Sequence, residues 1–317
     1  MRRGREISVA AAIVVLAILL AATAPRYFSP DNLGDLFLTN VPVLFVALGM
    51  TLVILAGEID ISVGSVFAVA SVLAGIVAKS GWPAYLAALA GCAGGAILGT
   101  VNGALVAYVR IPSIVATLAA MAALRDALRW STEGAWIENL PASFQWMGLS
   151  QSSYRIMILI FSLALSAVLA WGLKNLAAGR AVYATGSSEE SARIAGLNTR
   201  AIKVSVFGVL GALAGMAGAL NAVRFNQIPS NAGLGLELKV IASVVIGGAA
   251  VTGGSGTVAG TVLGVALLGA IGPALTFWGI NAYWEKAIQG LIILVAIVAD
   301  AIRSRRPEGE RVAAKHA

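Results

Sequence analysis

Cysteine and histidine are almost absent from this chain of 317 residues, which contains one of each. A disulfide needs two cysteines and a zinc site of the usual kind needs several Cys or His ligands, so neither can form within one chain. Cys92 lies in an apolar stretch of glycine and alanine and is most simply a small packing residue, while His316 lies near the C-terminus. The sequence therefore offers neither a metal site nor a catalytic site.

Charged residues are also scarce, at 12% of the chain, whereas hydrophobic residues make up 59% and the mean hydropathy is +0.88. Soluble domains carry about a quarter charged residues, so this composition excludes a water-soluble enzyme. It predicts an all-α polytopic membrane protein, in contact with lipid, that forms a single domain over residues 1–317. Apolar runs of roughly membrane-spanning length predict about ten transmembrane helices, some of them broken, at 7–24, 41–57, 63–79, 83–109, 112–129, 154–173, 203–223, 238–252, 257–278 and 286–302.

The net charge of +7 is explained by membrane topology rather than by nucleic-acid binding. If the N-terminus is cytoplasmic, 14 of the 22 Lys and Arg residues fall on the inside segments, as the positive-inside rule requires. Both termini, the 174–203 loop and a basic tail at 303–317 are then cytoplasmic. The first run also resembles a cleavable signal peptide, but an uncleaved first helix is needed to keep the 174–203 loop inside.

A polar island interrupts the apolar sequence at 179–196. Ser187 followed by Glu190 has the spacing of a capping box, and Gly196 can adopt the left-handed conformation that ends a helix. We expect a two-turn helix that carries Glu189, Glu190 and Arg193 outward as a handle for a soluble partner. The alternative is a solvated loop that contains one capped turn.

Two apolar stretches contain breaks that ordinary spans lack. Glu58 and Asp60 lie within 48–66, and a second interruption at 247–256 contains several glycines. Paired interruptions point to the pathway of a transporter, although tight cytoplasmic turns between packed helices remain an alternative. Asp60 either caps a helix that begins near Ser62 or titrates in an ion-coupled cycle.

Small and aromatic residues show two further patterns. Glycines spaced four apart allow close helix packing, at Gly91, Gly95 and Gly99 and again at Gly211 and Gly215. The 130–153 segment is rich in aromatic residues, which form either an interfacial belt or a docking and gating surface with a short amphipathic helix around 141–147.

No phosphate-binding G-x-x-x-x-G-K-[ST] motif occurs, so the chain cannot bind ATP in this way and a transport cycle driven by ATP needs a partner. Two rival functions remain. An ion-coupled secondary transporter of small polar solutes needs an intramembrane titrating group, for which Glu58, Asp60 and Asp126 are the candidates. A membrane-embedded enzyme lacks the usual acid–base or metal apparatus here.

Five collinear motifs, at 46–65, 102–118, 179–198, 231–248 and from Gly253 onward, resemble the ribose-type permease family of ATP-binding-cassette (ABC) sugar importers. The stretch at 136–144 is similar to the branch that handles rhamnose or a furanose-type autoinducer. The resemblance implies a permease subunit of the bacterial inner membrane that imports a monosaccharide such as ribose or rhamnose and is not itself an enzyme. It also implies a second permease subunit, identical or related, two ATPase subunits that bind ATP and Mg, and a periplasmic sugar-binding protein.

The resemblance places the ATPase-coupling element on Gly179, Arg180, Glu189, Glu190, Ala192 and Gly196. Ser191 departs from the wider E-A-A-x-x-x-G pattern by a small-for-small change. Glu58 stands where family members often have a second glycine, which leaves its role open. Candidate residues for the pathway or the broken helix are Asp60, Ser62, Asn102, Asn221, Gln227 and Asn231, and the sugar itself is not specified.

Overall fold

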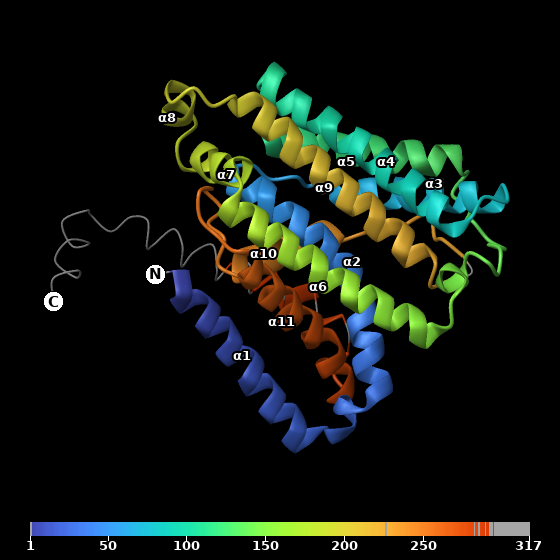
Figure 1. Ribbon diagram of the computed structural model, residues 1–317. Coiled ribbons are helices and arrows are strands. Elements are labelled where there is room, and N and C mark those ends of the chain that lie inside the picture. Colours follow the sequence, from blue (N-terminus) through green and yellow to red (C-terminus); the bar gives the residue numbers. More distant parts are fainter. Residues whose placement is uncertain are drawn as a thin grey trace.

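The computed structural model describes residues 2–225, 227–281, 283–284, 286–288, 290–291 and 294. In this part of the chain the structure is helical, and the one β-pairing is an isolated bridge between Ile137 and Ile228. Figure 1 shows long helices that run side by side between the two ends of an elongated bundle. The helices are α1 Arg2–Thr23, α2 Pro30–Leu55, α3 Val63–Lys79, α4 Ala84–Ala104, α5 Ser113–Ser131, α6 Gln151–Asn175, α7 Ala177–Ser187, α8 Glu189–Ile194, α9 Thr199–Ala222, α10 Leu236–Ile246 and α11 Val258–Phe277.

Among the described residues, six helical segments are long and apolar enough to cross a membrane, namely those within α1, α2, α4 with its π-helical extension Leu105–Val109, α6, α9 and α11. The eleven residues of α10 extend only about 16 Å at 1.5 Å per residue, against a hydrocarbon core of about 30 Å. This length agrees with the prediction that some spans are broken, which stays a prediction. Each of the first nine predicted runs overlaps a helix, whereas most of 286–302 and all of 303–317 lie outside the described residues. The number of ten spans therefore stays a prediction.

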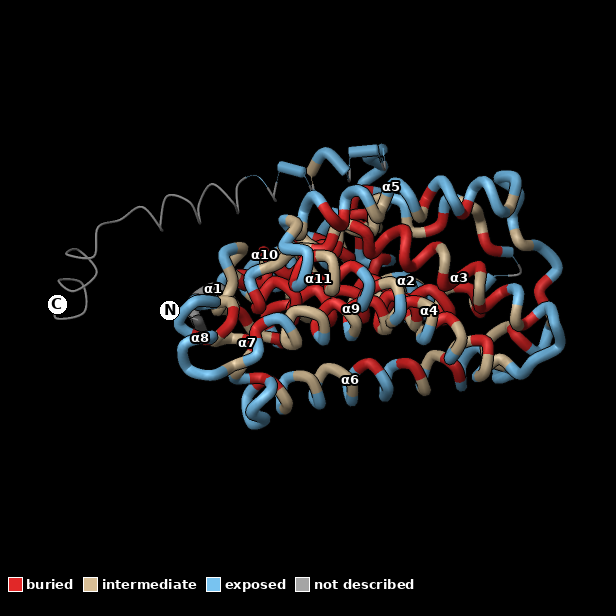
Figure 2. Tube along the Cα trace, turned by 90° about the horizontal axis from the view of Figure 1, so that it is seen from above, coloured by how far each residue is buried: buried red, intermediate tan, exposed pale blue. Residues whose placement is uncertain are grey.

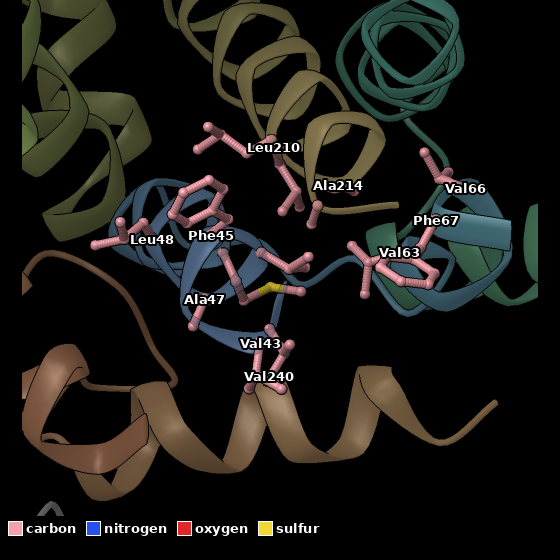
Figure 3. Close-up of a cluster of buried hydrophobic side chains, with 14 of the residues drawn as sticks. Val43, Phe45, Ala47, Leu48, Val63, Val66, Phe67, Leu210, Ala214 and Val240 are labelled. Carbon is pink, nitrogen blue, oxygen red and sulfur yellow. The ribbon is translucent and has the colours of Figure 1, made fainter. Parts of the chain in front are cut away.

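The core forms around α2, most of which is buried (Figure 2). Phe45 of α2 lies on the side of Leu210 of α9, while Val240 of α10 lies next to Val43 on another face of α2 (Figure 3). The outer helices α1 and α6 instead expose large apolar side chains, as lipid-facing or partner-facing helices do.

Glycine determines how closely α4 and α9 approach each other. A Cβ atom added to Gly95 or Gly99 would collide with the backbone of α9, and one added to Gly211 or Gly215 would collide with that of α4. The sequence prediction that these glycines allow close helix packing is confirmed.

The predicted amphipathic helix around 141–147 is wrong. The structure has turns followed by a single 3-10 turn, Gln145–Gly148, in which Trp146 and Met147 adopt positive φ angles of 52° and 57°. An α-helix cannot continue through left-handed residues. The turn is anchored by the Trp146 N–H, which donates to the Val223 carbonyl at 2.8 Å, and by the buried Phe144 ring.

The first turns of α1 lie at the same end of the bundle as α7 and α8 (Figure 1). The Thr257 hydroxyl at the start of α11 donates to the Glu6 carboxylate and attaches α1 to this end. We refer to it below as the α8 end.

Candidate functional site

The polar island folds into two consecutive helices, α7 and α8, rather than one. Ser188 separates them with an extended backbone (φ −164°, ψ 105°), and its hydroxyl caps α8 by accepting the Ser191 N–H at 3.2 Å. The prediction that Ser187 caps the helix is wrong, because Ser187 is the last residue of α7 and an N-cap needs a non-helical backbone. The predicted capping box is also absent, since the Glu190 carboxylate pairs with Arg193 at 2.8 Å.

Gly196 ends the α8 segment as predicted. Its φ is +84°, and the next amide, from Leu197, donates back to the Ala192 carbonyl at 3.0 Å. This is the left-handed helix stop that glycine favours.

The six predicted coupling residues occupy one continuous element but differ in exposure. Gly179 and Ala192 are buried, the former against the end of α6, where a Cβ would collide with the Leu173 backbone. Arg180 donates to the Asn175 carbonyl at 3.0 Å and holds the corner between α6 and α7. Glu189, Glu190 and Gly196 lie on the exposed surface of the α8 end.

The element touches both interrupted segments. A Cβ on Gly186 of α7 would collide with the Leu55 carbonyl at the end of α2 and with the Gly254 amide. That amide donates to the same Leu55 carbonyl at 3.0 Å, and the Tyr183 hydroxyl donates to the Gly256 carbonyl at 2.8 Å. The polar island, through α7, and the two predicted breaks therefore meet at one junction, which the sequence did not require.

A three-residue ion cluster links α8, α9 and the segment between α2 and α3. The Lys203 ammonium group lies 2.6 Å from a Glu58 carboxylate oxygen and 2.7 Å from a Glu189 oxygen. The hydrogen bond from Lys203 holds the pKa of the Glu189 carboxyl below its usual range, and the Thr199 hydroxyl adds a further contact at 3.3 Å. The open role of Glu58 is thus answered structurally: it is an ion-pair partner.

Hydroxyl and amide side chains hold the break between α2 and α3. The Asp60 carboxylate accepts the Ser62 N–H at 2.7 Å and the Ser62 hydroxyl at 2.6 Å, and Asn102 donates to that hydroxyl at 2.8 Å. Ser113 and Thr117 of α5 accept the neighbouring amides of the break, those of Ile59 and Ile61, at 3.3 and 3.0 Å. The break is therefore a defined structure in which buried backbone donors have partners.

The other pathway candidates do not join this group. Asn221 is half-buried in the last turn of α9, eighteen residues and about 27 Å along the helix from Lys203. Gln227 and Asn231 are exposed in the loop between α9 and α10. Only Asp60, Ser62 and Asn102 are brought together.

A hollow of about 510 Å³ opens beside the ion cluster. Its wall combines cations and acids from four parts of the chain, namely α8, α9, the segment between α2 and α3 and the turn between α4 and α5: Glu58, Arg110, Glu189, Glu190, Arg193, Arg200 and Lys203. Charged groups gathered in this way suit contact with water and a polar partner rather than with lipid. Among the described residues, no group of three His, Cys, Asp or Glu is placed to hold a metal ion.

Sequence reasoning missed Ser113, Thr117 and the central position of Lys203. Ser113 and Thr117 are four residues apart, a spacing that places both hydroxyls on one helix face and could have indicated them. Lys203 gave no such signal, because its partners lie 145 and 14 residues away in sequence.

Comparison with known proteins gives two findings. A family model described as branched-chain amino acid transport system / permease component matches residues 32–297. The autoinducer 2 import system permease protein LsrC of Salmonella typhi is 38% identical over 304 residues, which is 94% of this chain and 86% of the relative. The LsrC protein of Escherichia coli (strain K12 / DH10B) is 36% identical over 305 residues, 94% of this chain and 87% of the relative. No solved structure matches this chain.

Proposed function

This chain belongs to the family of branched-chain amino acid transport system permease components, and on that premise we propose that it forms the translocation pathway of an ABC importer for a monosaccharide-like cargo. Membership makes it a multi-pass inner-membrane transport subunit and not an enzyme, and the apolar helices agree with this. The chemistry of ATP belongs to a partner.

One observation supports the mechanism most directly: α7, which leads directly into α8, packs against the ends of both interrupted segments. In the proposed complex the ATPase subunits, which bind ATP and Mg, contact the exposed charges of α8. A second permease subunit lies alongside in the membrane, and a periplasmic binding protein delivers the cargo at the opposite end. Both termini and the 174–203 loop then lie in the cytoplasm.

The cargo we favour is autoinducer 2, with ribose and rhamnose as alternatives. Autoinducer 2 import stands in the names of relatives that match 94% of this chain. The family description instead names branched-chain amino acids, so leucine is the appropriate competing cargo in any test.

An ion-coupled mechanism has less support from the site. The Asp60 carboxylate is buried, with 1% of the residue exposed, and it is engaged by two donors from Ser62. Glu58 and Glu189 share one ammonium group at the α8 end, where a partner can contact the chain.

The decisive experiment reconstitutes the permease with its ATPase, its second permease subunit and its binding protein in vesicles. We expect uptake of labelled autoinducer 2 that requires ATP and stops when the ATPase subunit carries an inactive phosphate-binding loop. Uptake that ignores ATP and follows an imposed pH gradient would reject the proposal, and ATP-dependent uptake of leucine alone would reject the proposed cargo.

Contact with the ATPase can be tested by cysteine cross-linking, because Cys92 is the only native cysteine. In a Cys92→Ser background, Glu190→Cys should cross-link to the ATPase subunit. Trp130→Cys is the matched control, since Trp130 is 84% exposed and lies in the last turn of α5, away from the Arg110 turn that borders the hollow. Cross-linking of both positions, or of neither, would contradict the assignment of α8.

A further inference from the structure

Lys203 differs from the other paired cations of the described chain in its surroundings. Its side chain is 12% exposed and that of Glu58 is 13% exposed, whereas the Glu190–Arg193 and Asp126–Arg129 pairs are more than half exposed on both sides and Arg155 and Asp35 are 31% and 64% exposed. Surface pairs of the latter kind contribute little, but an enclosed ammonium group that loses its partners remains an uncompensated charge.

Each group of this cluster comes from a different element of the fold. Glu189 is the first residue of α8, Lys203 lies in the second turn of α9, and Glu58 lies in the break between α2 and α3. One ammonium group therefore joins the surface proposed to meet the ATPase to the proposed pathway.

The link continues from Glu58 into the membrane along the chain. The next four residues form the hydrogen-bonded break, in which Ser113 and Thr117 hold the amides of Ile59 and Ile61 and Asp60 holds Ser62. Ser62 directly precedes the first residue of α3. Glu58 therefore lies only five residues before the first residue of α3, a helix that begins in the core, and a displacement of its side chain would act on the segment that leads into this helix.

The other route from the coupling element into the bundle is of a different kind. At the junction of Gly186, Leu55 and Gly254, the backbones touch without intervening side chains, so α7 packs directly on the end of α2. The α8 helix, in contrast, packs on α9 sparsely, and Ile194 on it is 78% exposed. The ion cluster is its main polar attachment to the rest of the protein among the described residues.

We propose that Lys203 is a positioning residue that transmits displacement of α8, through its shared contacts with Glu189 and Glu58, to the broken segment before α3. This inference rests on the proposed function, because it takes the ATPase to be what displaces α8. The two carboxylates allow the ammonium group to keep one partner while it changes its distance from the other, so the cluster can adjust without exposing a bare charge.

The test measures coupling, not activity alone. Lys203→Met retains the length of the side chain and removes the charge, whereas Lys203→Arg retains the charge. Arg129→Met is the control: it removes a cation from an exposed pair in the last turn of α5, at the end of that helix away from Ser113 and the break. For each reconstituted complex we would measure assembly with the ATPase, thermal unfolding, ATP hydrolysis and molecules of autoinducer 2 imported per ATP hydrolysed.

We expect Lys203→Met to assemble and hydrolyse ATP while importing at least tenfold less cargo per ATP. Lys203→Arg should recover most of the ratio, and Arg129→Met should match the wild type. Glu58→Gln should also lower the amount of cargo imported per ATP. Because Glu58 is enclosed and has no proposed contact with the ATPase, such a loss would come from the link to Lys203 and not from weaker ATPase binding. The double variant Glu58→Gln/Lys203→Met should be no worse than Lys203→Met, because both changes cut one link.

An unchanged ratio of import to hydrolysis in Lys203→Met would overturn the inference. If Lys203→Met fails to assemble, Glu58→Gln decides: a normal ratio in that variant overturns the inference, and a reduced ratio with normal assembly supports it. A wild-type complex without ATP-dependent uptake would instead remove the proposed function itself, so the two failures are distinguishable.

Discussion

Replacement of Asp60 by asparagine or alanine separates a structural carboxylate from a titrating one. Asp60 is buried beside the start of α3, and one of its carboxylate oxygens accepts both the N–H and the hydroxyl of Ser62. An asparagine offers a carbonyl oxygen at the same position and can form the same local bond to the Ser62 N–H two residues on. Alanine leaves both Ser62 donors without an acceptor.

The expected magnitudes follow from these two hydrogen bonds. A bond to a charged group contributes about 1.5–3 kcal/mol and a neutral one about 0.5–1.5 kcal/mol, so Asp60→Asn costs at most about 2–3 kcal/mol, offset in part by the easier burial of an amide. In Asp60→Ala each stranded donor costs about 1–3 kcal/mol, or about 2–6 kcal/mol together. Asn102 does not replace the lost acceptor, because its amide group donates to the Ser62 hydroxyl oxygen and does not accept the hydroxyl proton in this bond.

The assay is thermal unfolding of the purified permease, together with ATP-dependent uptake by the reconstituted complex. We expect the midpoints to fall in the order wild type, Asp60→Asn, Asp60→Ala, and uptake by Asp60→Asn to remain at half the wild-type rate or more. Asp126→Asn, which alters an exposed pair at 3.7 Å, should change neither quantity. An Asp60→Asn complex that assembles fully but transports nothing would refute the structural role of Asp60 as an acceptor for Ser62 and favour ion coupling.

Three further substitutions test the local structure. Gly196 has φ +84° with no atom within 4 Å of an added Cβ, so the cost of replacing it is purely conformational. Gly196→Asn should be tolerated, whereas Gly196→Val should weaken assembly with the ATPase. Equal effects of the two substitutions would contradict the left-handed helix stop. Ser188→Ala should destabilise α8 by about 0.5–2 kcal/mol while Ser187→Ala should not, a difference that amide hydrogen exchange of α8 would report. Gly211→Ala should lower the thermal unfolding midpoint by overpacking against α4, at a cost of about 1–3 kcal/mol, and an unchanged midpoint would mean that α4 and α9 can separate.

Hydropathy predicted the existence of most spans but not all of their ends. The run at 63–79 coincides with α3 because a break and a loop interrupt the apolar sequence on both sides. The run at 41–57 misses the first eleven residues of α2, which begins at Pro30 after the Ser29 cap and carries Asp31 in its first turn. Hydropathy detects the part of a helix that crosses lipid, whereas caps determine where the helix begins.

The candidate site was predictable in its parts and not in its assembly. The two breaks, the left-handed stop at Gly196 and the pairing of Asp60 with Ser62 involve neighbours in sequence, so local rules apply to them. The choice of Ser188 over Ser187 as the cap depends on one backbone torsion that two adjacent serines leave open. The cluster of Lys203 with Glu58 and Glu189 is a product of tertiary folding, and no spacing rule connects these positions.

The junction of Leu55, Gly186 and Gly254 also constrains the order of biogenesis. The Leu55 carbonyl ends α2 near the beginning of the chain, yet its partner amide belongs to Gly254, 199 residues later. At about 5–20 residues per second, about 10–40 s of synthesis separate the two residues. During that interval α2 is already in the membrane, but its end cannot reach the native arrangement. The native packing at the α8 end can therefore form only after Gly254, in the last third of the chain, has been synthesised. A product truncated before Gly254 cannot form the hydrogen bond to the Leu55 carbonyl.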